Sequence, residues 1–458
     1  MNRWLLPCLC ALLVGTQSSG RIAAAEQMSL DVSPVYNILK AGEKQTTWIR
    51  VGVTGFQLES EKKRASVNLA IVLDKSGSMS GEKIQRAREA AVDAIRMLRD
   101  DDIVSVITYD STVEVLVPAT KLTDREDVIR RINEITPGGN TALFAGVSKG
   151  AAEVRKFLDR ERVNRIILLS DGQANVGPSS PGELGGLGKS LLKENISVST
   201  LGLGLGYNED LMVQLATASG GNHLFIEEAA ELADIFRREF DDVLSVVAQE
   251  VDIAITIPEG IRPVRVLGND ADIDGKQVTT RLAQVYSKQN RHVVIEVELT
   301  AHDVDAKQKL AGVTVSYANM KTHESDRLSG TARVTFSDDE KKVSESVNRS
   351  VMADVVALVS SEQNKLATRY LDEGDLKKCR EVLRGNMAFL NDNAALCPDD
   401  GTRLKALADQ NGRQLSQLEE ARSNSDASAT RARKSFRSYQ SEVDAQQRVT
   451  SPAGNGTP

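Results

Sequence analysis

The stretch NLAIVLDKSGSMSGEKI, residues 68–84, decides the fold of this chain. It begins with an apolar run of strand length that ends at Asp74, and a helical pattern begins a few residues later. Ser76 and Ser78 lie between the two, each two residues after the previous oxygen-bearing side chain. In an extended loop every second side chain points to the same side, so these three side chains can converge on one point beyond the strand.

The alternation of strand and helix continues from Val67 to about Phe240. Segments of helical period, such as EKIQRAREAAVDAIRMLR and DREDVIRRINEI, separate the apolar runs VNLAIVL, DIVSVITY, RIILLS and ISVSTLGLG. Buried strands that alternate with helices predict an α/β fold with a doubly wound, mostly parallel sheet over residues 67–240. In open sheets of this kind ligands bind beyond the carboxyl ends of the strands, and the Asp74 loop lies at such an end.

The segments on either side of this region have a different character. WIRVGVTGF precedes it with an alternation of period two, and VDIAITIP, HVVIEVELT, GVTVSYAN and TARVTFS follow it without intervening helices. This pattern predicts antiparallel sheet. We expect residues 26–66 to pair with residues 247–340 in one β-sandwich domain that receives the α/β unit as an insertion, because the first segment alone is too short to bury a sheet face. Two independent small β pieces are the alternative.

Residues 344–447 have a helical composition, and residues 448–458, which end in SPAGNGTP, are expected to be disordered. The segments SVMADVVALVSSEQNKLATRYLDEG and DLKKCREVLRGNMAFL predict a helix pair around a Glu-Gly-Asp turn. The basic cluster RARKSFR, residues 431–437, could contact an acidic surface, although such runs are usually solvated faces of helices.

Composition and charge limit the classes of function. The chain has 458 residues, of which 41% are hydrophobic and 26% charged, and this describes a globular protein of several domains. The net charge of −7 gives no electrostatic reason to expect nucleic acid as the main partner.

The first residues resemble a signal peptide, which we assign to residues 1–25. Arg3 provides the positive start, WLLPCLCALLVG an apolar core of about a dozen residues, and Ala23–Ala25 a small-residue cleavage site. The protein is therefore expected to be secreted or periplasmic, with a mature chain that starts near Glu26 and no membrane span. Cys379 and Cys397 remain after cleavage, and in an oxidising compartment they are expected to form a disulfide, with two separate packed thiols as the alternative.

Two further loops offer oxygen ligands. TPGGNTALFAG puts Thr141 after a Gly-Gly turn, and IILLSDGQANVG puts Asp171 at the end of a buried strand. The complete set, Asp74-x-Ser76-x-Ser78, Thr141 and Ser170-Asp171-Gly172, resembles the metal-ion-dependent adhesion site of von Willebrand factor type A domains. The resemblance covers residues 67–240. The remaining chain is more loosely similar to secreted bacterial proteins grouped with calcium-activated chloride channel homologues, and to inter-alpha-trypsin inhibitor heavy chains.

The resemblance implies a role for each of these residues. Ser76, Ser78 and Thr141 would offer hydroxyl oxygens to a divalent cation, while Asp74 and Asp171 would act directly or through water. The sixth coordination position would stay open for a Glu or Asp carboxylate of a partner protein. A set rich in hydroxyls and low in charge favours Mg²⁺, with Mn²⁺ or Ca²⁺ able to substitute.

Other motifs are incomplete. The four histidines do not form a His-Glu-x-x-His zinc motif, and no nucleophile elbow surrounds Ser170, so we expect no enzyme activity. DADIDG, residues 270–275, resembles the start of a calcium loop, but Arg281 occupies the twelfth position, and a hairpin turn is the other interpretation.

The sequence therefore predicts a metal-dependent, adhesion-type protein-binding module of an exported protein. A cell-envelope assembly scaffold, which would use the helical C-terminal region as its interface and the metal for stability only, is the alternative. A hydrolase is a third hypothesis, for which the sequence holds no complete catalytic set.

Overall fold

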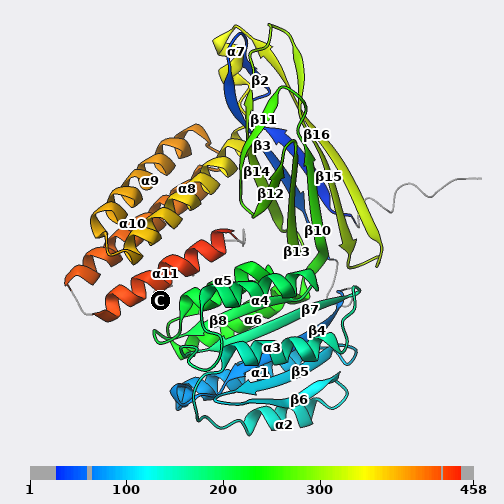
Figure 1. The fold of residues 1–458 in the computed structure, drawn as a ribbon, viewed down its shortest axis with the longest axis vertical. Coiled ribbons are helices and arrows are strands. Elements are labelled where there is room, and N and C mark those ends of the chain that lie inside the picture. Colours follow the sequence, from blue (N-terminus) through cyan, green and yellow to red (C-terminus); the bar gives the residue numbers. More distant parts are fainter. Residues whose placement is uncertain (1–26, 59–63, 424–425, 445–458) are drawn as a thin grey trace, which may run out of the picture.

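The computed structural model describes residues 27–58, 64–423 and 426–444. Figure 1 shows an α/β unit, a β-sandwich beside it and a helical region that lies along both. The predicted signal peptide (1–25) and disordered tail (448–458) fall outside the described residues. None of the helices described is both long and apolar enough to cross a membrane.

The α/β unit is built on one six-stranded sheet with the order β6-β5-β4-β7-β8-β9. All neighbouring strands are parallel except β6, which is antiparallel to β5. The strands are β4 (Ser66–Asp74), β5 (Ile103–Tyr109), β6 (Val113–Lys121), β7 (Arg162–Ser170), β8 (Ser197–Leu203) and β9 (His223–Ile226). The helical segments are η3 (Gly77–Met79), α1 (Glu82–Met97), α2 (Arg125–Asn133), α3 (Leu143–Arg155), α4 (Pro181–Lys193), α5 (Glu209–Ser219), η4 (Ala229–Glu231) and α6 (Leu232–Leu244).

Strand β4 lies in the middle of this sheet and is buried on both faces. Leu69 and Ile71 pack with α1, α2 and α6 on one face, whereas Ala70 and Val72 pack with α3, α4 and α5 on the other. Gly150 lets α3 approach closely, because a Cβ atom there would lie 2.7 Å from Val72 Cγ2. Helices on both faces of a mostly parallel sheet confirm the doubly wound α/β fold.

The sandwich consists of a four-stranded sheet, β1-β3-β14-β11, and a six-stranded sheet, β12-β13-β10-β15-β16-β2. Strand β3 pairs with β14 in one continuous antiparallel ladder, from Gln45 opposite Leu299 to Thr54 opposite Asn290. The α/β unit is therefore inserted between two segments that form the same sandwich (Figure 1). The strands are β1 (Ser29–Pro34), β2 (Ile38–Lys40), β3 (Gln45–Thr54), β10 (Val246–Thr256), β11 (Ile261–Leu267), β12 (Ala271–Asp274), β13 (Gln277–Tyr286), β14 (Asn290–Leu299), β15 (Lys307–Asn319) and β16 (Ser325–Ser337).

The DADIDG segment belongs to this sandwich as a hairpin. Strand β12 pairs with β13 through Asp274 opposite Gln277, and Gly275 in the turn has a φ of 57°. The hairpin interpretation of this segment is confirmed.

The C-terminal region is helical. It contains α7 (Glu340–Glu345), α8 (Arg349–Asp372), α9 (Leu376–Leu396), α10 (Gly401–Ser423) and α11 (Asp426–Asp444). Helix α8 is fastened to the sandwich, since Asp354 accepts a hydrogen bond from Arg50 at 2.6 Å. Helix α11 runs back between the helical region and the α/β unit (Figure 1). Its basic cluster contacts acidic side chains of the same chain, including Glu227 and Glu209, so it is not simply a solvated helix face.

The predicted disulfide is wrong. Cys379 lies in α9 and Cys397 caps the end of the same helix, and both are free and buried. At about 1.5 Å of rise per residue the helix places the two Cα atoms roughly 27 Å apart, whereas a disulfide needs Cα atoms within about 7 Å. The structure therefore contains the alternative, two separate packed thiols, and burial raises the pKa of Cys379 to about 11.

Candidate metal centre

The predicted ligands come from three loops at the carboxyl edge of the sheet. Asp74 is the last residue of β4, and Asp171 directly follows β7, which is its neighbour in the sheet. Thr141 precedes α3 in the loop that leads into that helix. The parallel pairing of β4 and β7 thus brings the first and third loops side by side.

Hydrogen bonds connect four of the five predicted residues. Asp74 Oδ1 accepts a hydrogen bond from the Ser76 backbone N–H at 2.8 Å, and the Ser76 and Ser78 hydroxyl oxygens are 3.0 Å apart. The Ser78 hydroxyl donates to Asp171 Oδ1 at 2.7 Å. The prediction missed the role of Ser170, whose hydroxyl donates to Asp74 Oδ2 at 2.6 Å. The position of Ser170 directly before Asp171 in the motif could have indicated that role.

Thr141 reaches the same place from the second loop. Its backbone N–H donates to Asn175 Oδ1 at 2.9 Å, which ties it to the third loop. A Cβ atom at Gly172 would lie 2.8 Å from Thr141 Oγ1 and 3.6 Å from Asp74 Oδ2. The threonine hydroxyl and the aspartate carboxylate therefore face the same small space, which only a glycine at position 172 leaves open. The structure brings all five predicted residues together.

Backbone hydrogen bonds hold the first two loops in place. The Gly77 N–H donates to the Gly139 carbonyl at 3.0 Å, and the Gly138 N–H donates to the Lys75 carbonyl at 2.7 Å. Gly139 has a φ of 77°, in the left-handed region that favours glycine. The second glycine of the turn before Thr141 is thus a structural requirement for the second loop.

The electrostatics of this site favour a cation. The side chains of Asp74 and Asp171 are almost fully buried, and burial raises the pKa of Asp74, with a further contribution from the negative charge of Asp171. Hydrogen bonds from Ser170 and Ser76 act in the opposite direction. The Lys83 ammonium forms an ion pair with Asp171 Oδ2. Two neighbouring buried carboxylates repel each other and are stabilised by positive charge.

The donor set fits a hard divalent cation. Three hydroxyls and two carboxylates are oxygen ligands of the type that Mg²⁺ accepts, together with water. Ser78 is exposed, so one side of the cluster faces solvent. Within the described ranges no group of three or more His, Cys, Asp or Glu side chains could hold a metal ion, and the cluster at Asp74 itself combines only two carboxylates with hydroxyls.

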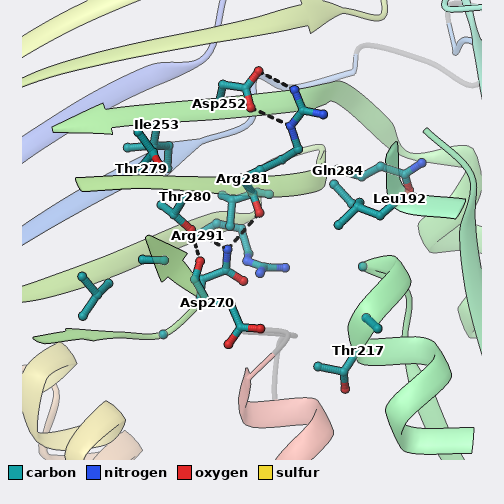
Figure 2. A pocket seen from close by; sticks show the side chains of 18 of the residues that line it. Leu192, Thr217, Asp252, Ile253, Asp270, Thr279, Thr280, Arg281, Gln284 and Arg291 are labelled. Atoms are coloured by element: carbon teal, nitrogen blue, oxygen red, sulfur yellow. Dashed lines mark hydrogen bonds and ion pairs between the residues drawn. The ribbon is translucent and has the colours of Figure 1, made fainter. Parts of the chain in front are cut away.

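A second concave region lies elsewhere. A cavity of about 1000 Å³ separates α4 and α5 from strands β10 to β13 and reaches α8. Figure 2 shows that side chains lining it pair with one another: Arg281 makes two hydrogen bonds to Asp252, at 2.6 and 2.7 Å. Thr280 donates to the Asp270 carbonyl at 2.6 Å. The cavity is a gap between the α/β unit and the sandwich, with charges of both signs and no convergent ligand set.

Known proteins resemble this chain over the same region. The model of the von Willebrand factor type A domain matches residues 68–238. An uncharacterized protein of Synechocystis is 23% identical, and the match covers 73% of this chain and 81% of that protein. Inter alpha-trypsin inhibitor, heavy chain 4, of Mus musculus is 30% identical over 40% of this chain, which is only 21% of the mouse protein.

A solved structure supports the fold along most of the chain. The von Willebrand factor type A protein from Catenulispora acidiphila superimposes with a TM-score of 0.67 and 17% identity, covering 86% of this chain and 90% of that one. The family match, the relatives and the doubly wound sheet agree. Residues 68–238 of this chain therefore form a von Willebrand factor type A domain.

Proposed function

We propose that this chain is a metal-dependent, adhesion-type protein-binding module of an exported protein. Domains of this family generally serve in protein interaction. In the proposed function a divalent cation, Mg²⁺ in the first place, is held by Asp74, Ser76, Ser78, Thr141 and Asp171, and the partner contributes a Glu or Asp carboxylate. We propose no catalytic activity. The leader-like start of the sequence supports export.

One observation carries this proposal: five oxygen-bearing side chains from three loops gather at the carboxyl edge of the sheet, around the space beside Gly172. A bound cation would supply the positive charge that attracts the partner's carboxylate. The chain's own groups would prepare the site. The Ser170 hydroxyl and the Ser76 N–H orient the Asp74 carboxylate, and the exposed Ser78 lies where a partner can approach.

Substitution of Asp74 tests the proposal. We expect Asp74→Ala to abolish Mg²⁺ binding in calorimetry and to leave the circular dichroism spectrum unchanged. In affinity capture from the native cell envelope, the variant should no longer retain the proteins that a chelator releases from the wild type. Asp93→Ala, which removes a partly exposed carboxylate on α1, is the matched control and should leave both intact.

The scaffold alternative predicts another result. Helices α9 and α10 form an arm beside the sandwich, with α11 between this arm and the α/β unit (Figure 1), and the surface of the arm could carry an interface of its own. If Asp74→Ala still captures the same proteins but has a lower melting temperature than the wild type, the scaffold is favoured and the adhesion proposal is contradicted.

A further inference from the structure

Lys83 occupies an unusual position at the metal centre. It is the second residue of α1, in the first turn, where the helix macrodipole favours acidic rather than basic side chains. Its side chain is 34% exposed, while that of its partner Asp171 is 0% exposed. The helix dipole disfavours a lysine at this position, so the ion pair with the buried Asp171 carboxylate is what holds the side chain there.

The end of β8 leaves room for this contact. Gly204 follows β8 with a φ of 72°, and a Cβ atom there would lie 3.8 Å from both Cε and Nζ of Lys83. The lysine side chain thus extends from α1 across the carboxyl edge of the sheet, beside the Gly204 backbone. One third of the lysine side chain faces solvent, whereas the Asp171 side chain does not.

Both oxygens of the Asp171 carboxylate have partners. Oδ1 accepts from the Ser78 hydroxyl at 2.7 Å, and Oδ2 pairs with the Lys83 ammonium. Each oxygen keeps a second lone pair, but a divalent cation that used it would lie close to the Lys83 ammonium and be repelled by it. Lys83 and the cation therefore compete for the same carboxylate.

The balance of charge has a second consequence. Asp74, Asp171 and Lys83 together leave one negative charge in excess. A divalent cation reverses this and leaves one positive charge in excess, provided that Lys83 stays close. Without the lysine the occupied site would be neutral. The lysine thus makes the occupied site attractive to an anionic group.

We propose that Lys83 is a positioning residue and the internal counter-ion of the metal centre. It stabilises Asp171 when no cation is bound, lowers the affinity for the cation, and would add a positive charge at the occupied site that attracts the partner's carboxylate. This inference rests on the proposed function, since it concerns the same site.

Lys75 provides a matched control. It lies in the same loop as Asp74 and pairs with Asp110 at 3.1 Å, a carboxylate outside the predicted ligand set. Its side chain is 20% exposed, so it is similarly placed at the surface of this edge.

The experiment compares the full chain carrying Lys83→Met, Lys83→Arg or Lys75→Met with the wild type. The melting temperature is measured in chelator, and the Kd for Mg²⁺ alone is measured by calorimetry. For Lys83→Met we expect a lower melting temperature in chelator and a Mg²⁺ affinity higher on the order of tenfold, from Coulomb repulsion between the two cations near water. Lys83→Arg should keep both values near those of the wild type. Lys75→Met should change the Mg²⁺ affinity clearly less than Lys83→Met does, because the Lys75 ammonium pairs with Asp110 and not with a predicted ligand.

If Lys83 had a purely structural role, Lys83→Met would lower both the stability and the Mg²⁺ affinity. A lower melting temperature together with a higher Mg²⁺ affinity therefore identifies Lys83 as the counter-ion. Unchanged or weaker Mg²⁺ binding by Lys83→Met, with a wild type that binds Mg²⁺, would overturn this inference and leave the proposed function standing. If no form binds Mg²⁺, the proposed function fails, and an unchanged melting temperature of Lys83→Met in chelator would overturn the counter-ion role as well. Lys83→Gln replaces Lys83→Met if the latter does not fold.

Discussion

The Lys434 ammonium lies 2.7 Å from Glu209 Oε2, and this contact joins helix α11 to the first turn of α5. Lys434 is only 1% exposed, its Nζ donates to the Tyr207 carbonyl at 2.5 Å, and it lies 3.7 Å from the centre of the Tyr207 ring. Tyr207 belongs to the loop after β8, in which Gly206 comes so close to Asp171 that a Cβ atom would be 3.1 Å from its carbonyl. The C-terminal helices and the metal centre therefore contact the same loop.

Removal of the Lys434 charge should loosen α11. In Lys434→Met, Glu209 loses one charged hydrogen bond and keeps the one from Arg437, so we expect a loss of about 1.5–3 kcal/mol and faster hydrogen exchange in residues 430–440. Arg431→Gln breaks a partly exposed pair with Glu227 and should change stability by at most about 1 kcal/mol. Equal exchange rates in Lys434→Met and wild type would contradict this prediction.

Acid should destabilise the protein through His223. Burial, together with the charges of Lys434 and Arg437, lowers the pKa of His223 to about 3. The unfolded chain takes up a proton near its ordinary pKa of 6.5 and the folded chain does not, so the free energy of unfolding falls as the pH falls from 6.5 towards 3.

The variant His223→Gln tests this linkage. Between pH 6.5 and 5 the histidine contributes a decrease of about 2 kcal/mol, which the variant should lack. The measurement is urea unfolding at several pH values. His292, whose pKa burial lowers to about 4, keeps its own pH dependence in both proteins, so the difference between them isolates His223. If the free energies of unfolding of the wild type and of His223→Gln change equally with pH, the assignment to His223 is wrong.

A methyl group at Gly172 should damage the metal centre selectively. The Cβ of Gly172→Ala would lie 2.8 Å from Thr141 Oγ1, so the threonine hydroxyl must leave its present position. We expect a loss of at least tenfold in Mg²⁺ affinity by calorimetry, of the size seen when a metal ligand loses its orientation. Gly138→Ala is the control, because a Cβ atom there meets nothing within 4 Å. A similar Mg²⁺ affinity in the two variants would argue against Thr141 as a ligand.

The interface between the α/β unit and the sandwich contains a buried arginine. Arg165 of β7 is 0% exposed and donates to Ser199 at 3.0 Å, to Gln284 at 2.8 Å and to Tyr286 at 2.9 Å. Glu239 of α6 lies 3.8 Å from the guanidinium and is 2% exposed. Gln284 and Tyr286 belong to β13, so this arginine connects the two parts of the chain.

Removal of one member of the Arg165–Glu239 pair should destabilise the protein strongly. Arg165→Met leaves Glu239 buried without its counter-charge, and we expect a loss of about 3–5 kcal/mol in urea unfolding. The double variant Arg165→Met, Glu239→Gln removes that buried charge and should recover part of the loss. If the double variant is as unstable as the sum of the two single variants, the pair does not act as a unit.

The residues that were predicted correctly are those whose relation is local in sequence or follows from strand order. Asp74, Ser76 and Ser78 share one loop, and Asp171 ends a strand of the same parallel sheet. The contact of Lys83 with Asp171 was not predicted. For Lys434 the sequence offered only an unspecified acidic surface as the partner of the basic cluster, because the contact joins residues far apart in the chain and no spacing encodes it. One feature of the sequence argued against the predicted disulfide. The helical pattern that holds Cys379 continues almost to Cys397, and a single straight helix keeps its ends apart.

The ladder between β3 and β14 constrains the order in which the chain can fold during synthesis. When β3 has been made, β1 is available on one side, but the partner on the other side, β14, lies beyond the whole inserted α/β unit. The backbone groups of β3 that face β14 therefore stay unpaired while that unit is made. The inserted unit has its own core and can fold in the meantime, whereas the sandwich must wait for the later strands, as expected for a topology dominated by distant contacts. A fragment that stops before β14 would expose unpaired strand edges and tend to aggregate.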